Sequence, residues 1–255
     1  MIKGLYSAFT ALEAGWRYQD VLANNIANVT TPGFKRELAA QQAFQDVLIS
    51  RQAPVPSPLS ARIQDVVGQI GTGTFIAEFA TDFSAGAFQA TGNELDIALE
   101  RGFLAVQDPA GQVFYTRDGR LGRDAAGDLV TSHGYYILNQ DGGHIRLPGE
   151  PVAVEPDGTI TQRGQQIDAL QVVDFAPGQL ARAGEGYFTA AAPGEPVSAG
   201  ARQGYLEASN SNMVEELTTL LAVQRTFQAN QTILSKLDST LAIAAGQLGT
   251  VGGTA

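Results

Sequence analysis

Apolar residues recur every three or four positions at both ends of this 255-residue chain, and that periodicity limits the folds open to it. Near the N-terminus it forms a heptad seam with one polar member. The seam reads Leu5, Phe9, Leu12, Trp16, Gln19, Ala23 and Ile26. This spacing predicts a helix from about residue 3 to about residue 29, roughly 40 Å long at 1.5 Å per residue. Pro32 disfavours helix at Thr31, and Gly33 then frees the backbone to turn.

The C-terminal end has a second seam of similar length. Every seventh residue is apolar in the series Met213, Leu220, Phe227, Leu234, Leu241 and Leu248. Asn212 is a good N-cap, and Glu215 stands three residues later, where its carboxylate can reach back to the cap. The glycine-containing tail after Leu248 cannot continue a helix. These signals predict a helix over most of residues 213–248.

A single apolar stripe of this kind usually belongs to the core of a globular domain. Two seams of similar length at opposite ends of the chain favour another arrangement, in which the terminal helices pair antiparallel as an α-helical coiled coil. The seam residues are then candidates for an assembly interface.

The middle of the chain has a different pattern. Glycine- or aspartate-containing turn signals recur about every eight residues between short apolar or alternating runs, which predicts an inserted antiparallel β domain. Pro54, Pro56 and Pro58 mark an extended connector before it. The expected fold class is therefore α+β. Its expected parts are a discontinuous coiled-coil domain of residues 1–32 plus 205–255, a connector of 33–92 and a β domain of 93–204.

Charge and cysteine content narrow the classes of partner. A formal net charge of −10 and an isoelectric point near 4.6 argue against nucleic acid and anionic membranes. The absence of cysteine excludes a disulfide framework and a thiolate metal site. We recognise no cleaved secretion signal, because Glu13 and Arg17 interrupt the apolar residues that follow Lys3, and no stretch approaches the ~20 apolar residues of a membrane span.

Residue patterns for catalysis are missing. His133 and His144 lie in or beside predicted turns, and no nucleophile elbow or zinc-protease helix occurs. The Asp-Gly pairs lack the spacing of a calcium loop, so we interpret them as turns. The arginine-rich stretch 117–123 is interpreted as a paired surface strand, with a subunit contact as the alternative. We expect no enzyme activity, cofactor or metal, and we expect the function to lie in surfaces.

Several long blocks resemble the bacterial flagellar rod and hook family of axial proteins. They are "LANNIANVTTPGFKR" at 22–36, "TGNELDIALERGFLAVQ" at 91–107, "YTRDG" at 115–119 and "QGYLEASNSNMVEELTTLLAVQRTFQAN" at 203–230. One β domain of moderate length resembles the FlgG/FlgF-type rod proteins. The phrase "QIGTGTF" and the connector's length favour the distal, FlgG-like type over the proximal, FlgF-like type. The segment "LSKLDSTLAIAAGQL" at 234–248 departs from the usual family phrase.

The resemblance implies a structural subunit that polymerises helically into the hollow drive shaft of the basal body. It implies partners among its own copies, other rod subunits, the hook protein, ring proteins and a rod cap. It also implies export by the flagellar type III route to a rod that spans the periplasm. Asn24, Asn25 and Asn28 are then expected to cap the first helix and to contact neighbouring subunits.

A rival reading from another class is a soluble β-rich carbohydrate-binding or hydrolytic protein. Its candidate residues are Asp96, Glu100, Tyr135 and Tyr136, which show no recognisable spacing.

Overall fold

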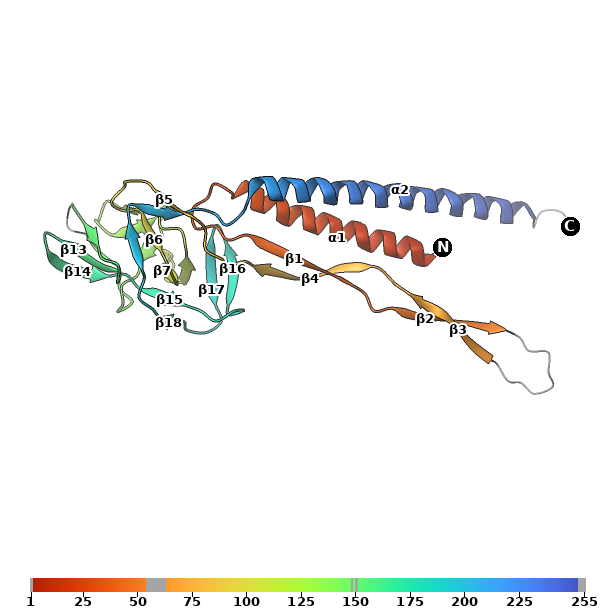
Figure 1. Ribbon diagram of the computed structural model, residues 1–255, viewed down its shortest axis with the longest axis horizontal. Coiled ribbons are helices and arrows are strands. Elements are labelled where there is room, and N and C mark those ends of the chain that lie inside the picture. The colour runs from red at the N-terminus through yellow and green to blue at the C-terminus, as the bar shows by residue number, and fades with distance from the viewer. Residues whose placement is uncertain (1, 54–62, 148, 150, 252–255) are drawn as a thin grey trace. The chain divides into compact units, whose positions relative to one another are not determined.

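The computed structural model describes residues 2–53, 63–147, 149 and 151–251 and has an α+β fold (Figure 1). In chain order its elements are α1 (Ile2–Ala27), β1 (Glu37–Ala43), β2 (Val47–Ala53), β3 (Ile63–Ile70), β4 (Thr74–Thr81), β5 (Phe88–Ala90), β6 (Ile97–Leu99), β7 (Phe103–Gln107), β8 (Val113–Thr116), β9 (Leu121–Arg123), β10 (Leu129–Thr131), β11 (Tyr136–Ile137), β12 (Ala153–Val154), β13 (Thr159–Gln162), β14 (Gln165–Ala169), β15 (Val172–Asp174), β16 (Leu180–Gly184), β17 (Tyr187–Ala190), β18 (Glu195–Pro196), β19 (Ala201–Gln203), β20 (Tyr205–Glu207) and α2 (Met213–Val251).

Both helices predicted from the seams are present. The first ends at Ala27, five residues before Pro32, and the second starts directly after Asn212, where the capping signal predicted it. Neither helix of the described residues is long and apolar enough over its length to cross a membrane.

The chain divides into two compact units. The terminal unit comprises residues 1–24, 37–80 and 214–255, and the central unit comprises residues 25–36 and 81–213. Both are discontinuous in sequence. The chain therefore passes from one unit to the other near the ends of both helices and again next to β1 and β4.

The terminal unit contains the two long helices and four strands. The helices run antiparallel and approach each other at two glycines of α1 (Figure 1). A Cβ atom built on Gly15 would lie 3.5 Å from Cδ2 of Phe227, and one built on Gly4 would lie 3.8 Å from Cδ1 of Leu237. Residues without side chains at these points allow a close approach.

The described residues of the segment expected as an extended connector include four strands that pair with one another. β1 pairs with β4, and β2 pairs antiparallel with β3, with Val47 opposite Ile70 and Ala53 opposite Ile63. Phe44 stacks on Phe75 at a ring-centroid distance of 4.8 Å. The three prolines that mark the expected connector lie at 54–58, outside the described residues. The alternating residues on either side of them form the strands.

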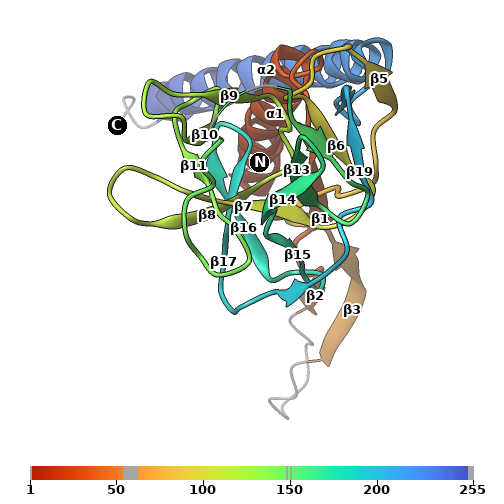
Figure 2. The same cartoon turned by 90° about the vertical axis from the view of Figure 1, so that its left-hand side faces the viewer.

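The central unit is built on a nine-stranded antiparallel sheet, several strands of which are labelled in Figure 2. Its main path runs β16-β17-β8-β7-β11-β10-β9, and β15 joins β7 to β18. The order is a meander only in places, because β7 and β8 are flanked by strands that lie far away in the sequence. The smaller pairs β5–β20 and β6–β19 join the start of this unit to its end.

The hydrophobic core lies within the central unit. Leu104, Val106, Ile137 and Ile145 have no measurable exposure, and Leu129 and Ile160 are almost as deeply buried. The predicted turns between the strands are present: Gly111 N–H donates to the Asp108 carbonyl, and Gly127 N–H donates to that of Asp124. At Arg163–Gly164 both residues have positive φ, as a two-residue hairpin turn requires.

Candidate assembly interface

The N-terminal seam is partly exposed in the terminal unit. Phe9 and Trp16 are 57% and 63% exposed, whereas Leu5 and Leu12 are half-buried. The most buried apolar residues of α1 are instead Ala8, Ala14, Val21 and Leu22. The large aromatic side chains of the seam are therefore exposed in the single subunit, and smaller apolar residues form the buried side of α1.

The C-terminal seam lies mainly on the half-buried side of α2. Met213 is 49% exposed at the first helical residue, while Leu220, Phe227, Leu234 and Leu241 are all half-buried. Further large apolar residues lie outside the predicted seam. Leu221, Ile233 and Ile243 are 55%, 51% and 61% exposed.

A groove runs between the two helices where the seams face each other. Leu5, Tyr6, Phe9 and Leu12 line it from α1, and Leu234 and Ser235 are among the residues that line it from α2. Its volume is about 750 Å³. An open, largely apolar groove on an isolated subunit is a surface that a partner helix can fill.

The two-stranded ribbon β2–β3 and the pair β1–β4 add to the exposed apolar surface. Val47, Leu48 and Ile49 are 44%, 63% and 37% exposed, and Phe79 of β4 is 45% exposed. A two-stranded ribbon is at best marginally stable in water without a covering layer, and its outer edges present unpaired backbone groups.

The three asparagines at the end of α1 have different surroundings. Asn24 is exposed, Asn25 is 1% exposed, and Asn28 is half-buried. The Asn28 side-chain oxygen accepts a hydrogen bond from Thr31 Oγ1 at 3.2 Å, and its carbonyl accepts one from the Thr31 N–H. Asn28 therefore closes the turn that follows the helix. The predicted contacts of Asn24 and Asn25 with neighbouring subunits stay a prediction.

A buried ionic junction lies beside this turn, inside the central unit. Glu207 on β20 accepts hydrogen bonds from Lys35 Nζ at 2.8 Å and from Arg117 Nε at 2.8 Å. The three side chains are 1%, 2% and 7% exposed. They come from three separate blocks of the sequence, "TPGFKR", "YTRDG" and "GYLEASN", and we call them the charge junction.

Backbone groups complete the charge junction. Lys35 Nζ also donates to the Ser84 carbonyl at 2.7 Å, and the Gly86 N–H donates to Glu207 Oε1 at 2.8 Å. The guanidinium of Arg117 donates to the carbonyls of Leu99 and Gly102. The interpretation of 117–123 as a surface strand is therefore wrong for Arg117, which is buried because it binds Glu207 and two carbonyls at once. Its neighbour Arg120 pairs with Asp118 at 2.7 Å.

The junction keeps its carboxylate ionised. Burial raises the pKa of Glu207, but the adjacent Arg117 and Lys35 lower it by more, so that the pKa lies below its ordinary value of 4.5. For Lys35 burial is the largest influence, and it lowers the pKa of the ammonium group below 10.5 against the attraction of Glu207. Glu207 is shared between two cations, and the charge of Arg117 also repels that of Lys35. The charged form of Lys35 is therefore less stabilised than it would be in a simple ion pair.

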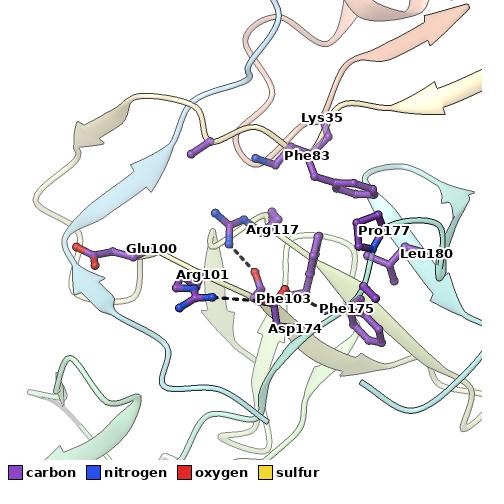
Figure 3. A pocket seen from close by; sticks show the side chains of 13 residues that line it. Lys35, Phe83, Glu100, Arg101, Phe103, Arg117, Asp174, Phe175, Pro177 and Leu180 are labelled. Atoms are coloured by element: carbon purple, nitrogen blue, oxygen red, sulfur yellow. Dashed lines mark hydrogen bonds and ion pairs between the residues drawn. The ribbon is translucent and has the colours of Figure 1, made fainter. Parts of the chain in front are cut away.

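A pocket of about 270 Å³ opens beside the charge junction (Figure 3). Its lining includes Phe83, Phe103 and Phe175, together with Lys35, Arg101 and Arg117. Phe83 and Phe103 meet edge to face at 5.6 Å. Lys35 and Arg117 are both bound to Glu207, which fixes them in position.

The residues of the rival carbohydrate reading have structural partners. Glu100 pairs with Arg202 at 2.5 Å, and the ring of Tyr136 stacks on His144 at 4.3 Å. Tyr135 stacks on Tyr187 at 4.5 Å. Asp96 is 7% exposed and accepts a hydrogen bond from Asn93. The four side chains do not form a carboxylate pair flanked by aromatic platforms.

Sequence reasoning missed the charge junction. Each of its residues lies next to, or two or three positions from, a glycine: Gly33 before Lys35, Gly119 after Arg117 and Gly204 before Glu207. That local signal marks close backbone packing, but it does not say which charged residues meet, because they are up to 172 positions apart.

Known family profiles match three parts of the chain. The profile described as "Flagella basal body rod protein" matches residues 5–35, that of "Flagellar hook protein FlgE/F/G D1 domain" matches 100–162, and that of "Flagellar basal body rod FlgEFG protein C-terminal" matches 202–246. The three matches cover most of both helices and part of the core of the central unit.

Whole-length relatives agree with these matches. The flagellar basal-body rod protein FlgG of Bacillus subtilis is 33% identical, over 94% of this chain and 97% of the relative. FlgG of Agrobacterium fabrum is 29% identical, over 97% of this chain and 100% of the relative. A rod protein named FlgF, from Mesorhizobium japonicum, is 30% identical, over 94% of this chain and 95% of the relative.

Proposed function

This chain belongs to the flagellar basal-body rod protein family, and on that premise we propose that copies of it polymerise helically into a hollow rod through the apolar surfaces of the terminal unit. The protein is a FlgG-like structural subunit of the flagellar basal body and not an enzyme. The rival carbohydrate-binding or hydrolytic reading is set aside for that reason.

One observation supports polymerisation above the others: most of the large apolar side chains that are exposed among the described residues lie in the terminal unit. They occur on α1, on α2 and on the strands β1, β2 and β4. Surfaces of this kind on a soluble chain mark sites of protein–protein contact. A contact between different surfaces of identical subunits continues indefinitely when it does not close on itself, and a helical polymer results.

We propose that the terminal helices, within residues 1–32 and 205–255, pack as an α-helical coiled coil with each other and with the helices of neighbouring copies, forming the inner wall. The half-buried positions of α2 support this, because Leu220, Phe227, Leu234 and Leu241 follow a seven-residue repeat. Residues 33–92 would lock neighbouring copies along the axis. Residues 93–204 would form the outer layer.

The partners we propose are further copies of this chain, other rod subunits, the hook protein, the surrounding ring proteins and a rod cap. We propose export through the flagellar type III channel to a rod that crosses the periplasm. An unfolded chain fits a narrow channel, and the absence of cysteine avoids wrong disulfides in an oxidising compartment.

Substitutions on the exposed side of each helix test polymerisation without touching the core. Trp16→Asp and Leu221→Asp each place a charge at a side chain that is already exposed in the subunit. In a flagellated bacterium that lacks its own rod subunit of this type, we expect both variants to be produced and exported but to build no rod, because the carboxylate would be desolvated in the interface.

The matched control is Gln224→Asp, which adds the same charge at an exposed polar position of α2, and we expect a milder effect on motility. Rods of normal length and full motility with both Trp16→Asp and Leu221→Asp would refute polymerisation through these surfaces.

A further inference from the structure

We propose that Lys35, Arg117 and Glu207 are positioning residues: their charge junction ties together the chain segment that follows α1 and the segment that precedes α2, so that the end of the first helix and the start of the second are held at one joint. The proposal rests on the proposed function as a rod subunit. All three residues of the charge junction lie within the central unit.

Along the chain, the charge junction lies close to the end of α1 and to the start of α2. Lys35 follows the end of α1 by eight residues, and Glu207 precedes the start of α2 by six. Arg117 follows β8, in the middle of the unit. The junction therefore joins the incoming segment to the outgoing segment and joins both to the core sheet.

Backbone contacts beside the junction place the same two segments together. The Gly33 N–H donates to the Glu207 carbonyl at 2.8 Å, and the Arg36 N–H donates to Asn210 Oδ1 at 2.8 Å. The Asn210 amide in turn donates to the Asp82 carbonyl at 2.7 Å. The incoming segment, the outgoing segment and the segment before β5 are thus crosslinked around one point.

Close packing fixes the joint further. A Cβ atom on Gly33 would lie within 2.3 Å of the Arg117 backbone, and one on Gly86 would lie 1.9 Å from the Ala208 carbonyl oxygen. Gly33 also has a φ of +69°, which disfavours other residues. At both glycines the backbones touch, so no larger side chain fits there. The distance between the segments is therefore set by backbone contact, and the ion pairs of the charge junction maintain it.

The three charges predict different effects for the loss of the Lys35 charge and the loss of the Glu207 charge. Glu207 is a single anion between two buried cations. Removing the Lys35 charge leaves a neutral Arg117–Glu207 pair bound to the core and releases only the incoming segment. Removing the Glu207 charge leaves two buried cations facing each other, which is strongly unfavourable.

The experiment uses the dilute full-length subunit, so it does not depend on polymerisation. In Lys35→Met, we expect amide exchange at Gly33 and Arg36 to accelerate by roughly tenfold or more, the effect of losing one hydrogen bond to a charged group. Exchange at Ala105, whose N–H donates to the Gln171 carbonyl in the core sheet, should change by less than about twofold. Equal acceleration at Ala105, or none at Gly33, would overturn the proposal.

A second readout reports position directly. The chain has no cysteine, so Thr30→Cys and Met213→Cys provide unique sites for spin labels on the two segments. We expect one narrow distance distribution in the parent and a broader one in Lys35→Met. Arg202→Met, which breaks the exposed pair with Glu100, is the matched control and should leave the distribution narrow. An unchanged distribution in Lys35→Met would contradict a positioning role.

The double variant separates charge from packing. Glu207→Gln should lower the melting temperature more than Lys35→Met does. Adding Lys35→Met to Glu207→Gln should recover part of that loss, because one of the two unpaired cations is removed. If the losses simply add, the junction acts through packing and the charge argument fails.

Discussion

The central and terminal units use the same kinds of apolar residue in opposite ways. In the central unit Phe188 is 1% exposed and packs among Phe83 and Phe103, whereas in the terminal unit Phe9 is 57% exposed on α1. The central unit surrounds a continuous core, and the terminal unit buries mainly small residues such as Ala8 and Ala14. Apolar burial within one subunit accounts for the stability of the central unit but not for that of the terminal unit.

The difference indicates where each unit obtains its stabilisation. Apolar burial contributes roughly 25 cal/mol per Å², so exposed aromatic and aliphatic side chains leave a contribution unrealised. Neighbouring copies can supply it in a polymer. Under the proposed polymerisation, the central unit is a complete domain before assembly, and the terminal unit is completed by assembly.

Cutting the chain so that β5, β20 and the charge junction are lost should abolish folding of the central unit. A fragment of residues 93–203 lacks β5, β20, Lys35 and Glu207, and it leaves Arg117 buried without its carboxylate. We expect it to show no cooperative melting, whereas a fragment of residues 25–213 should melt cooperatively. Circular dichroism during heating distinguishes the two. Cooperative melting of 93–203 at the same temperature as 25–213 would show that the junction is dispensable.

Truncating matched phenylalanines should separate the two units. Phe188→Ala removes a buried ring and should destabilise the central unit by about 3–5 kcal/mol. Phe9→Ala removes an exposed ring and should change the unfolding free energy by less than about 0.5 kcal/mol. Urea denaturation of the dilute subunit measures both. A large loss for Phe9→Ala would mean that the terminal unit has a core of its own.

The stability of the central unit should fall at both extremes of pH. The folded-state pKa of Glu207 lies below 4.5, so its contribution is present above 4.5 and is lost as the pH falls through the lower folded value. Burial raises the pKa of Tyr187 to about 12, so the folded state favours its neutral form, and stability is lost as the pH rises from about 10 toward 12. Melting temperatures across the pH range measure both limbs. Glu207→Gln should remove part of the acid limb, and Tyr187→Phe should flatten the alkaline limb; a limb unchanged by its substitution would contradict that assignment.

Much of the fold was accessible from the sequence because periodicity reports local structure. The three- and four-residue spacing predicted both helices, and the cap at Asn212 predicted the start of the second. Turn signals such as Asp108–Gly111 predicted where strands end. The order of the strands in the sheet was not accessible, because pairing β7 with β11 and β15 depends on contacts between distant segments.

The candidate interface was predictable only in outline. Helical spacing identified a seam, but it did not show that Trp16 is exposed while Val21 and Leu22 are buried. Seven-residue spacing shows which residues share one face of a helix. It does not show whether that face packs against the other helix of the same subunit or stays exposed. The burial of Arg117 was missed for a related reason, since a charged residue in an acidic chain is usually solvated unless a distant carboxylate meets it.

Hydrogen exchange of the full-length subunit, dilute and assembled, shows whether the terminal unit is completed by neighbouring copies or is complete by itself. In the dilute subunit we expect amides of α1 and α2 to exchange many times faster than those of β7, because isolated helices are marginal in water without a covering partner. On assembly the helical amides should become protected while those of β7 hardly change. If α1 and α2 are as protected as β7 in the dilute subunit, and assembly adds nothing, then the terminal unit is complete by itself and the account is wrong.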